Sequence, residues 1–211
     1  MKWLPFLVDG AIITIQVTLL AGVVSTILAF LSGLGRLSNI APIRYVSRTY
    51  MEIFRASSLL VLLFWVYFAL PMIGLELPKL WAAVLAIGLN IGAYGSEIVR
   101  SAIVSIPQGQ YEASTALNLT PLQRMVKIIM PQAIVRMLPP MGNLWIELLK
   151  STSLVYFIAM YDLTFEAMII RNNNQSYEAI IFGLLLVIYF LLSTCVTVTV
   201  RLLERKLTAW R

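Results

Sequence analysis

The sequence contains no histidine and only one cysteine, Cys195, among its 211 residues. A single cysteine cannot form an internal disulfide or a multi-cysteine metal site. An integral-membrane enzyme would need a nucleophile, a metal or an acid–base set, and no carboxylates cluster on the side that is assigned to the cytoplasm below. We therefore expect no catalytic residue, no metal site and no enzymatic activity in this chain.

Charged residues are scarce as well. They make up 12% of the chain, and hydrophobic residues make up 60%, whereas about 25% of a typical soluble domain is charged. The net charge of +6 does not indicate nucleic-acid binding, because the basic residues lie between apolar runs instead of forming one patch. No GxxxxGK[ST] motif occurs, so the chain has no ATP-binding phosphate loop. The composition indicates an all-α polytopic membrane protein without a soluble domain.

Five apolar stretches approach the roughly 20 residues that cross a bilayer as a helix. We expect one transmembrane domain over residues 1–211, with spans at about residues 10–34, 57–73, 80–103, 140–160 and 179–200. Residues 40–55 have the character of an interfacial or short connecting helix before the second span. In the first span, small residues allow a neighbouring helix to approach closely; they are Gly22, Ser25, Ala29 and Gly33.

The basic residues predict the orientation of the chain. Most of the 16 lysines and arginines fall after the first span, after the third span and in the tail: Arg36, Arg44, Arg48, Arg55, Arg124, Lys127, Arg136, Arg201, Arg205, Lys206 and Arg211. The opposite side holds Lys2, Lys79 and Arg171. Because positive charge is retained on the cytoplasmic side, we expect the N-terminus outside and the C-terminus in the cytoplasm, as five spans require.

Between the third and fourth spans lies a mixed segment, residues 107–131. Pro107 suits a helix start, and Asn118 tolerates the left-handed conformation that often ends a helix. A second helix follows, with Thr120 as N-cap, Pro121 in its first turn and Gln123 completing a capping box. We expect this helix to stop near Pro131. The pattern predicts two short helices with one apolar and one polar face, either a docking surface or a plain interfacial loop.

The same segment resembles the cytoplasmic signature of bacterial ABC-importer permeases, EAA, three residues, G, nine residues, I, one residue, LP. The chain reads Glu112-Ala113-Ser114, Asn118, Ile128 and Met130-Pro131 at that spacing, with Ser114, Asn118 and Met130 departing from the family's letters. The stretches AYGSEIVRSAIVSIPQGQYEA and LLKSTSL are similar to the polar amino-acid branch, the histidine/glutamine type. The resemblance covers about residues 8–205.

The resemblance implies a bacterial inner-membrane permease with five spans, in agreement with the count above. It implies that the segment at 107–131 is a coupling helix, seated on an ATPase subunit that binds ATP and magnesium. Glu112, Ala113, Ser114 and Asn118 take this role by motif position, and we add Arg124 and Lys127 as electrostatic contributors. The implied partners are a second permease chain, two ATPases, an extracytoplasmic substrate-binding protein, membrane lipid and a small amino-acid-like substrate.

Four charged residues fall inside the expected spans: Glu97, Arg100, Glu147 and Lys150. Placing a charge at the bilayer centre costs about 2.5–3.5 kcal/mol, so each of these side chains must have an interaction or a function that offsets the cost. Both pairs have the i, i+3 spacing that lets side chains meet on one helix face. Each pair therefore either lines a substrate path or neutralises itself.

Glu147 and Lys150 are followed by Ser151, Thr152 and Ser153, and transporter sites often use locally unwound helices of this kind. Their depth depends on Pro139-Pro140, which we expect to break the helix. A helix that begins after these prolines places both charges near the midplane, and one that runs through from Pro131 places them toward the outer side. Asn90 and Tyr94 either line the path or pack inside the bundle. Asp162 and Glu166 lie closer to the outer face, as early substrate contacts, docking groups or solvated charges.

We therefore expect the membrane subunit of an ATP-driven importer of polar amino acids or related small zwitterions, which does not itself hydrolyse ATP. The alternative is a secondary, ion-coupled transporter that uses the intramembrane charges. The absence of an internal repeat weighs against it, because many such folds are built from repeats. An enzyme or a non-transporting scaffold protein explains fewer of these features.

Overall fold

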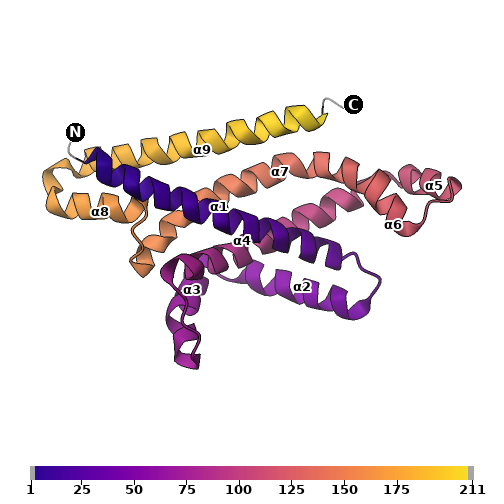
Figure 1. The fold of residues 1–211 in the computed structure, drawn as a ribbon, viewed down its shortest axis with the longest axis horizontal. Coiled ribbons are helices and arrows are strands. Elements are labelled where there is room, and N and C mark those ends of the chain that lie inside the picture. Colours follow the sequence, from indigo (N-terminus) through magenta and orange to yellow (C-terminus); the bar gives the residue numbers. More distant parts are fainter. Residues whose placement is uncertain (1–2, 209–211) are drawn as a thin grey trace.

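The computed structural model describes residues 3–208, and every regular element in that range is helical (Figure 1). The main helices are α1 (Leu4–Gly35), α2 (Ala41–Ala56), α3 (Leu59–Phe64), α4 (Lys79–Val104), α5 (Gln108–Ala116), α6 (Pro121–Arg124), α7 (Met130–Ser151), α8 (Leu163–Asn173) and α9 (Glu178–Thr208). Short turns of other helix types join them: η1 (Trp65–Ala69), η2 (Leu70–Ile73), η3 (Met125–Ile129), η4 (Thr152–Ile158) and η5 (Gln175–Tyr177). Lys2 and Arg211, which entered the charge pattern above, lie outside the described residues.

The centre of the fold is the pair α1 and α4, which pack side by side along most of their length. Small residues make this approach possible, as the sequence predicts. A side chain at Gly33 would lie 2.7 Å from Val99 Cβ, and one at Gly95 would lie 2.7 Å from Ala29 Cβ. Without a driving force from water, helices in lipid associate through such close van der Waals contact.

A short helix, α2, lies where the sequence predicts one at residues 40–55, and the chain bends sharply after it. α2 runs back along α1 and α4, and the chain then turns by 104° into the α3–η1–η2 segment, which stands out from the bundle (Figure 1). Asn90 of α4 is buried at the bend, and its amide donates to the carbonyls of Phe54 at 2.8 Å and Ser57 at 3.3 Å. Those bonds satisfy backbone groups that the break in the helix leaves without partners.

The expected stop near Pro131 is wrong. α6, η3 and α7 follow one another without a break. η3 is a π-helical turn, in which Met130 N–H donates to the carbonyl of Met125, five residues back. A proline in a regular α-helix lacks a donor and clashes with the carbonyl four residues back. The wider turn that precedes Pro131 accommodates this residue.

The expected break at Pro139-Pro140 is also wrong, because both prolines lie inside α7. On the packed side of the helix, Ala133, Met137 and Leu144 are buried against the rest of the chain. Tertiary contact of this kind lets membrane helices tolerate proline. α7 therefore continues past both prolines as one uninterrupted helix.

Within the described residues, three helices are long and apolar enough to span a membrane, and the number rises to five when each bent pair is one span. The second bent pair joins Pro121–Ile158 to α8 at 53°. In Figure 1 the helix pair α5–α6 lies at one end of the molecule, toward which α9 runs, and α8 lies at the other end with the start of α1. This arrangement is compatible with the five spans expected from the sequence.

Candidate functional site

Residues 107–131, which we call the coupling segment after the role that the resemblance implies, have the helix–break–helix form that the sequence predicts. α5 begins directly after Pro107 and ends at Ala116. Asn118 has a φ of +53°, which confirms the left-handed conformation expected of it. Thr120 and Gln123 form the predicted capping box, in which Thr120 Oγ1 accepts from Gln123 N–H and Gln123 Oε1 accepts from Thr120 N–H.

Arg124 holds the two helices of the segment together. Its guanidinium lies 5.6 Å from the centre of the Tyr111 ring, and Nη1 lies 3.4 Å from Thr115 Oγ1. A guanidinium over an aromatic face at this distance is a cation–π contact. Arg124 therefore joins α6 to α5 inside the segment. Lys127 is exposed to solvent.

The motif residues differ in what they present to solvent. Glu112 and Ala113 are exposed, whereas Ser114 is buried, with its hydroxyl donating to the Tyr111 carbonyl at 2.7 Å. A hollow of about 400 Å³ lies beside them, lined by Gln108, Tyr111, Glu112, Thr115 and Ala116. Ser114 is therefore part of the buried interior of the segment, whereas Glu112 and Ala113 form part of its solvent-exposed surface.

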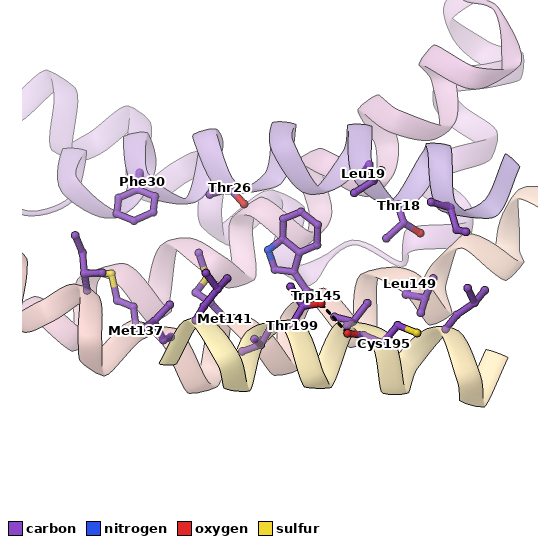
Figure 2. A pocket seen from close by; sticks show the side chains of 18 residues that line it. Thr18, Leu19, Thr26, Phe30, Met137, Met141, Trp145, Leu149, Cys195 and Thr199 are labelled. Carbon is purple, nitrogen blue, oxygen red and sulfur yellow. Dashed lines mark hydrogen bonds between the residues drawn. The ribbon is translucent and has the colours of Figure 1, made fainter. Parts of the chain in front are cut away.

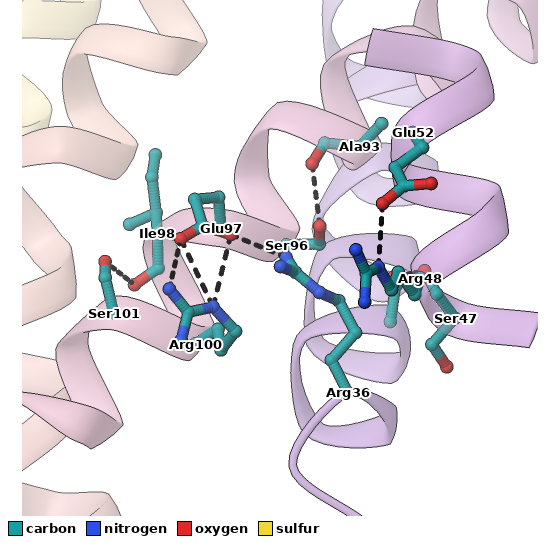
Figure 3. A network of polar contacts seen from close by, with 11 residues as sticks. Arg36, Ser47, Arg48, Glu52, Ala93, Ser96, Glu97, Ile98, Arg100 and Ser101 are labelled. Atoms are coloured by element: carbon teal, nitrogen blue, oxygen red, sulfur yellow. Dashed lines mark hydrogen bonds and ion pairs between the residues drawn. The ribbon is translucent and has the colours of Figure 1, made fainter. Parts of the chain in front are cut away.

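Glu97 and Arg100 meet as the i, i+3 spacing predicts, with Glu97 Oε1 2.5 Å from Arg100 Nη2. The same carboxylate binds a second arginine, because Glu97 Oε2 lies 2.6 Å from Arg36 Nη1 (Figure 3). Arg36 follows α1 in the chain, and its side chain is only 14% exposed. The network joins the end of α1 to α4, and this gives Glu97 a structural role.

Glu147 and Lys150 behave differently, because the ion pairs of the described residues do not include them. Both are exposed on α7, in one row with Asn143 at i, i+4 and i+7. A neighbouring face of the helix carries Leu144 and Leu148, which are buried in the core with α1 and α4. We call Asn143, Glu147 and Lys150 the polar row. Asn143 is the member that the sequence reasoning missed, although it has the same helical spacing.

The depth of the polar row can be read from Trp145. Its indole lies against Gly22, so closely that a side chain at Gly22 would collide with the ring. Gly22 is near the middle of α1 (Leu4–Gly35). The polar row is therefore level with the middle of the bundle, although the helix runs through from Pro131.

The hydroxyls after the polar row lie where the helix changes type, since α7 ends at Ser151 and η4, a 3₁₀ helix, begins at Thr152. Thr152 is buried and donates to the Leu149 carbonyl, and Ser153 donates to the Lys150 carbonyl. Ser151 is half-buried. Such bonds back to the helix occupy the hydroxyl hydrogens.

Two other polar residues take structural positions. Tyr94 is exposed, and its hydroxyl donates to the Arg55 carbonyl at 3.1 Å. Asp162 is fully buried as the N-cap of α8, where it accepts from the N–H groups of Thr164 and Phe165. Its carboxylate is therefore not the solvated loop charge that the sequence allows. Among the described residues, no group of three metal-ligating side chains converges.

Comparison with known proteins gives a consistent picture. Residues 22–209 match the family described as binding-protein-dependent transport system inner membrane component. The chain is 43% identical over 208 residues to the probable amino-acid ABC transporter permease protein y4tF of Sinorhizobium fredii, covering 96% of this chain and 87% of that protein. It is 34% identical over 203 residues to the L-cystine transport system permease protein TcyB of Bacillus subtilis, covering 96% and 87%.

A solved structure agrees with these relatives. The fold is similar to a chain in the crystal structure of an amino acid ABC transporter with histidines, with a TM-score of 0.89 and 33% sequence identity. The match covers 97% of this chain and 95% of that chain. The similarity therefore extends over the bundle and the coupling segment together.

Proposed function

Because this chain belongs to the family of binding-protein-dependent transport system inner membrane components and is the permease subunit of an amino-acid ABC importer, we propose that it carries polar amino acids or related small zwitterions across the membrane. The proposed domain is the whole chain, residues 1–211, in the bacterial inner membrane. In the proposed topology the N-terminus is outside and the C-terminus is cytoplasmic. The ion-coupled alternative is not retained, because the matched relatives are ABC transporter permeases.

The observation that carries the substrate proposal is the polar row on α7. Its carboxylate, ammonium and amide are exposed at the level of the middle of α1. Each charge there would cost about 2.5–3.5 kcal/mol if it faced lipid. A water-filled path, closed on its other side by a second permease chain, removes that cost, and polar residues in membrane bundles commonly mark such a path.

The chemistry of the row matches a free amino acid. Glu147 can accept from the substrate ammonium, Lys150 can donate to its carboxylate, and Asn143 can do either. At i, i+3 the two charged residues have Cβ atoms about 5–6 Å apart, so one small zwitterion can reach both. The half-buried Ser151 and Ser153 border this place, whereas Thr152 is fully buried in the chain.

Glu97 and Arg100 form the basic end of the same path in this proposal. α4 and α7 meet there, since Arg136 of α7 donates to the carbonyl of Ser105, just after α4. Glu97 with two arginines leaves one positive charge in the cluster. In the proposal this cluster of Glu97, Arg36 and Arg100 holds α1 and α4 together beside the cytoplasmic exit of the path.

The coupling segment is the proposed contact with an ATPase. Glu112, Ala113, Arg124 and Lys127 lie along its surface, and Ser114 and Asn118 set its internal shape. Two ATPase subunits would bind ATP and magnesium, and an extracytoplasmic binding protein would deliver the substrate. The relatives are transport subunits of ABC systems, and in the proposal this chain likewise leaves ATP hydrolysis to its partners.

The experiment replaces Glu147 with glutamine in the assembled transporter, reconstituted in proteoliposomes. We expect the substrate concentration for half-maximal ATPase stimulation to rise about tenfold, because a charge-assisted hydrogen bond contributes about 1.5–3 kcal/mol. Glu52→Gln is the matched control, since Glu52 is an exposed carboxylate on α2 paired with Arg48 at 2.7 Å. If Glu147→Gln and Glu52→Gln both leave substrate stimulation unchanged, the polar row is not the substrate path.

A further inference from the structure

An apolar groove of about 630 Å³ lies between α1, α7 and α9, apart from the polar row (Figure 2). On α1 it extends from Ile15 to Phe30, and on α9 it extends from Leu192 to Leu203. α7 supplies the floor, where Trp145 points toward α1 (Figure 2). Neither the importer chemistry nor the coupling segment uses this space.

Three threonine hydroxyls in the groove already have partners. Thr18 Oγ1 donates to the Thr14 carbonyl, Thr26 Oγ1 donates to the Gly22 carbonyl, and Thr199 Oγ1 donates to the Cys195 carbonyl, each at 2.7–2.8 Å. Hydroxyls bonded back to their own helix offer little to a polar ligand. The lining of the groove is therefore better suited to a hydrocarbon chain than to a polar ligand.

The groove is open to the lipid side of the bundle. In the most apolar stretch of α9 only 6% of the residues are buried in the chain, and its other faces carry large exposed residues such as Phe190 and Leu202. Along α9 the stretch from Leu192 to Leu203 measures roughly 16 Å. One leaflet contributes about half of the roughly 30 Å hydrocarbon core, so the α9 wall of the groove has the length of one leaflet.

A basic residue follows the groove-lining residues along α9. Leu192, Val196, Thr199 and Leu203 line it at successive i, i+4 or i+3 positions, and Lys206 is the next residue in that row. Lys206 is exposed in the last turns of α9. Arg205 is adjacent in the chain but points to a neighbouring face, because each residue turns the helix by about 100°.

From this arrangement we propose that the groove binds an anionic phospholipid, with one acyl chain between α1 and α9 and its phosphate at Lys206. Basic residues at a membrane surface attract acidic headgroups. In the orientation proposed above, the basic end of α9 faces the cytoplasm, so the lipid belongs to the cytoplasmic leaflet. The chemistry of the groove itself does not depend on that orientation.

The test uses phosphatidylglycerol with a photoreactive diazirine in one acyl chain, added to vesicles that contain the whole transporter. After illumination, cross-linked peptides of this chain are mapped by mass spectrometry. We expect labels on groove residues of α1, α7 and α9, displaced by unlabelled phosphatidylglycerol. Uniform labelling of all lipid-facing helices would overturn the proposal, and so would groove cross-links to a second protein chain, which would identify a protein segment as the occupant.

Two matched pairs of variants sharpen the test. Thr199→Trp fills the groove and should abolish its labelling, whereas Val198→Trp places the same side chain on the adjacent, 49% exposed position and should not. Lys206→Ala should lower the preference for diazirine phosphatidylglycerol over diazirine phosphatidylcholine about fivefold, the effect of one basic residue near an acidic surface. Arg205→Ala removes the same charge off the groove and should lower it less.

Equal effects of the two tryptophan variants, or of the two alanine variants, would contradict the assigned site. If Thr199→Trp fails to assemble, saturable displacement in the unmodified protein still decides the matter, because a specific site saturates and bulk lipid contact does not. None of these measurements depends on transport. Their failure is therefore distinct from failure of the importer proposal.

Discussion

At the scale of single residues, Glu97 is a carboxylate that pairs with two arginines. It binds Arg100 on its own helix and Arg36 beyond the end of α1 (Figure 3). Helical spacing predicts the first partner, because i, i+3 residues are neighbours. It cannot predict the second, since Arg36 and Glu97 are 61 residues apart and meet only because α1 and α4 pack closely at Gly33.

Glu97→Gln should destabilise the assembled chain by about 1–2 kcal/mol, since a hydrogen bond to a charged group contributes about 1.5–3 kcal/mol and partial exposure reduces this. The variant leaves Arg36, only 14% exposed, without its carboxylate. Thermal unfolding in detergent, followed by intrinsic fluorescence, measures the change. Arg100→Ala is the control and should cost less, because the Arg36–Glu97 pair remains. A smaller loss for Glu97→Gln than for Arg100→Ala would contradict this account.

At the scale of elements, local chemistry predicts the coupling segment better than it predicts α7. The capping box of Thr120 and the left-handed Asn118 are set by neighbouring residues, so the sequence alone reveals them. The continuity of α7 through Pro131, Pro139 and Pro140 depends on a π-turn and on burial against other helices. Such tertiary contacts override the local rule that proline ends a helix.

The left-handed conformation of Asn118 makes a prediction about coupling. Asn118→Gly should keep ATP-driven uptake and co-purification with the ATPase, because glycine adopts a φ of +53° without strain. Asn118→Val should weaken both, since a left-handed non-glycine residue costs about 1–2 kcal/mol and a β-branched side chain is worse. Uptake by proteoliposomes and pull-down of the ATPase measure the two effects. Normal coupling in Asn118→Val would show that the turn at this residue does not shape the docking surface.

At the scale of the whole molecule, the chain exposes more surface area than a compact soluble monomer of the same mass. Its accessible surface is 12480 Å², whereas a compact soluble monomer of 23.7 kDa exposes about 9,800 Å². The difference lies partly in the protruding segment from α3 to η2, where Val61, Trp65, Phe68 and Met72 form one exposed apolar row. Surface of this kind suits lipid or a second permease chain, and sequence patterning predicts the apolar run without predicting its 104° turn away from α2.

The proposed orientation of the whole molecule can be tested with single cysteines. Gly109 is exposed in α5, with no atom within 4 Å of an added Cβ, and Asn173 is exposed at the end of α8. In a Cys195→Ser background, Gly109→Cys should react with a membrane-impermeant maleimide only in inverted vesicles. Asn173→Cys should react only in right-side-out vesicles, because the positive-inside rule places the basic end in the cytoplasm.

Labelling of this chain is read by its mass shift, so that cysteines of other subunits do not interfere. Both variants should react fully after solubilisation in detergent, and Cys195→Ser alone should not react. The reverse pattern would place the coupling segment outside, where no ATPase could reach it, and would refute both the orientation and the docking assignment. Reaction of both cysteines from the same side would instead mean that an even number of spans separates α5 from the end of α8. That result would make the bent pair of α7 and α8 a re-entrant element, because a single crossing must put its two ends on opposite sides.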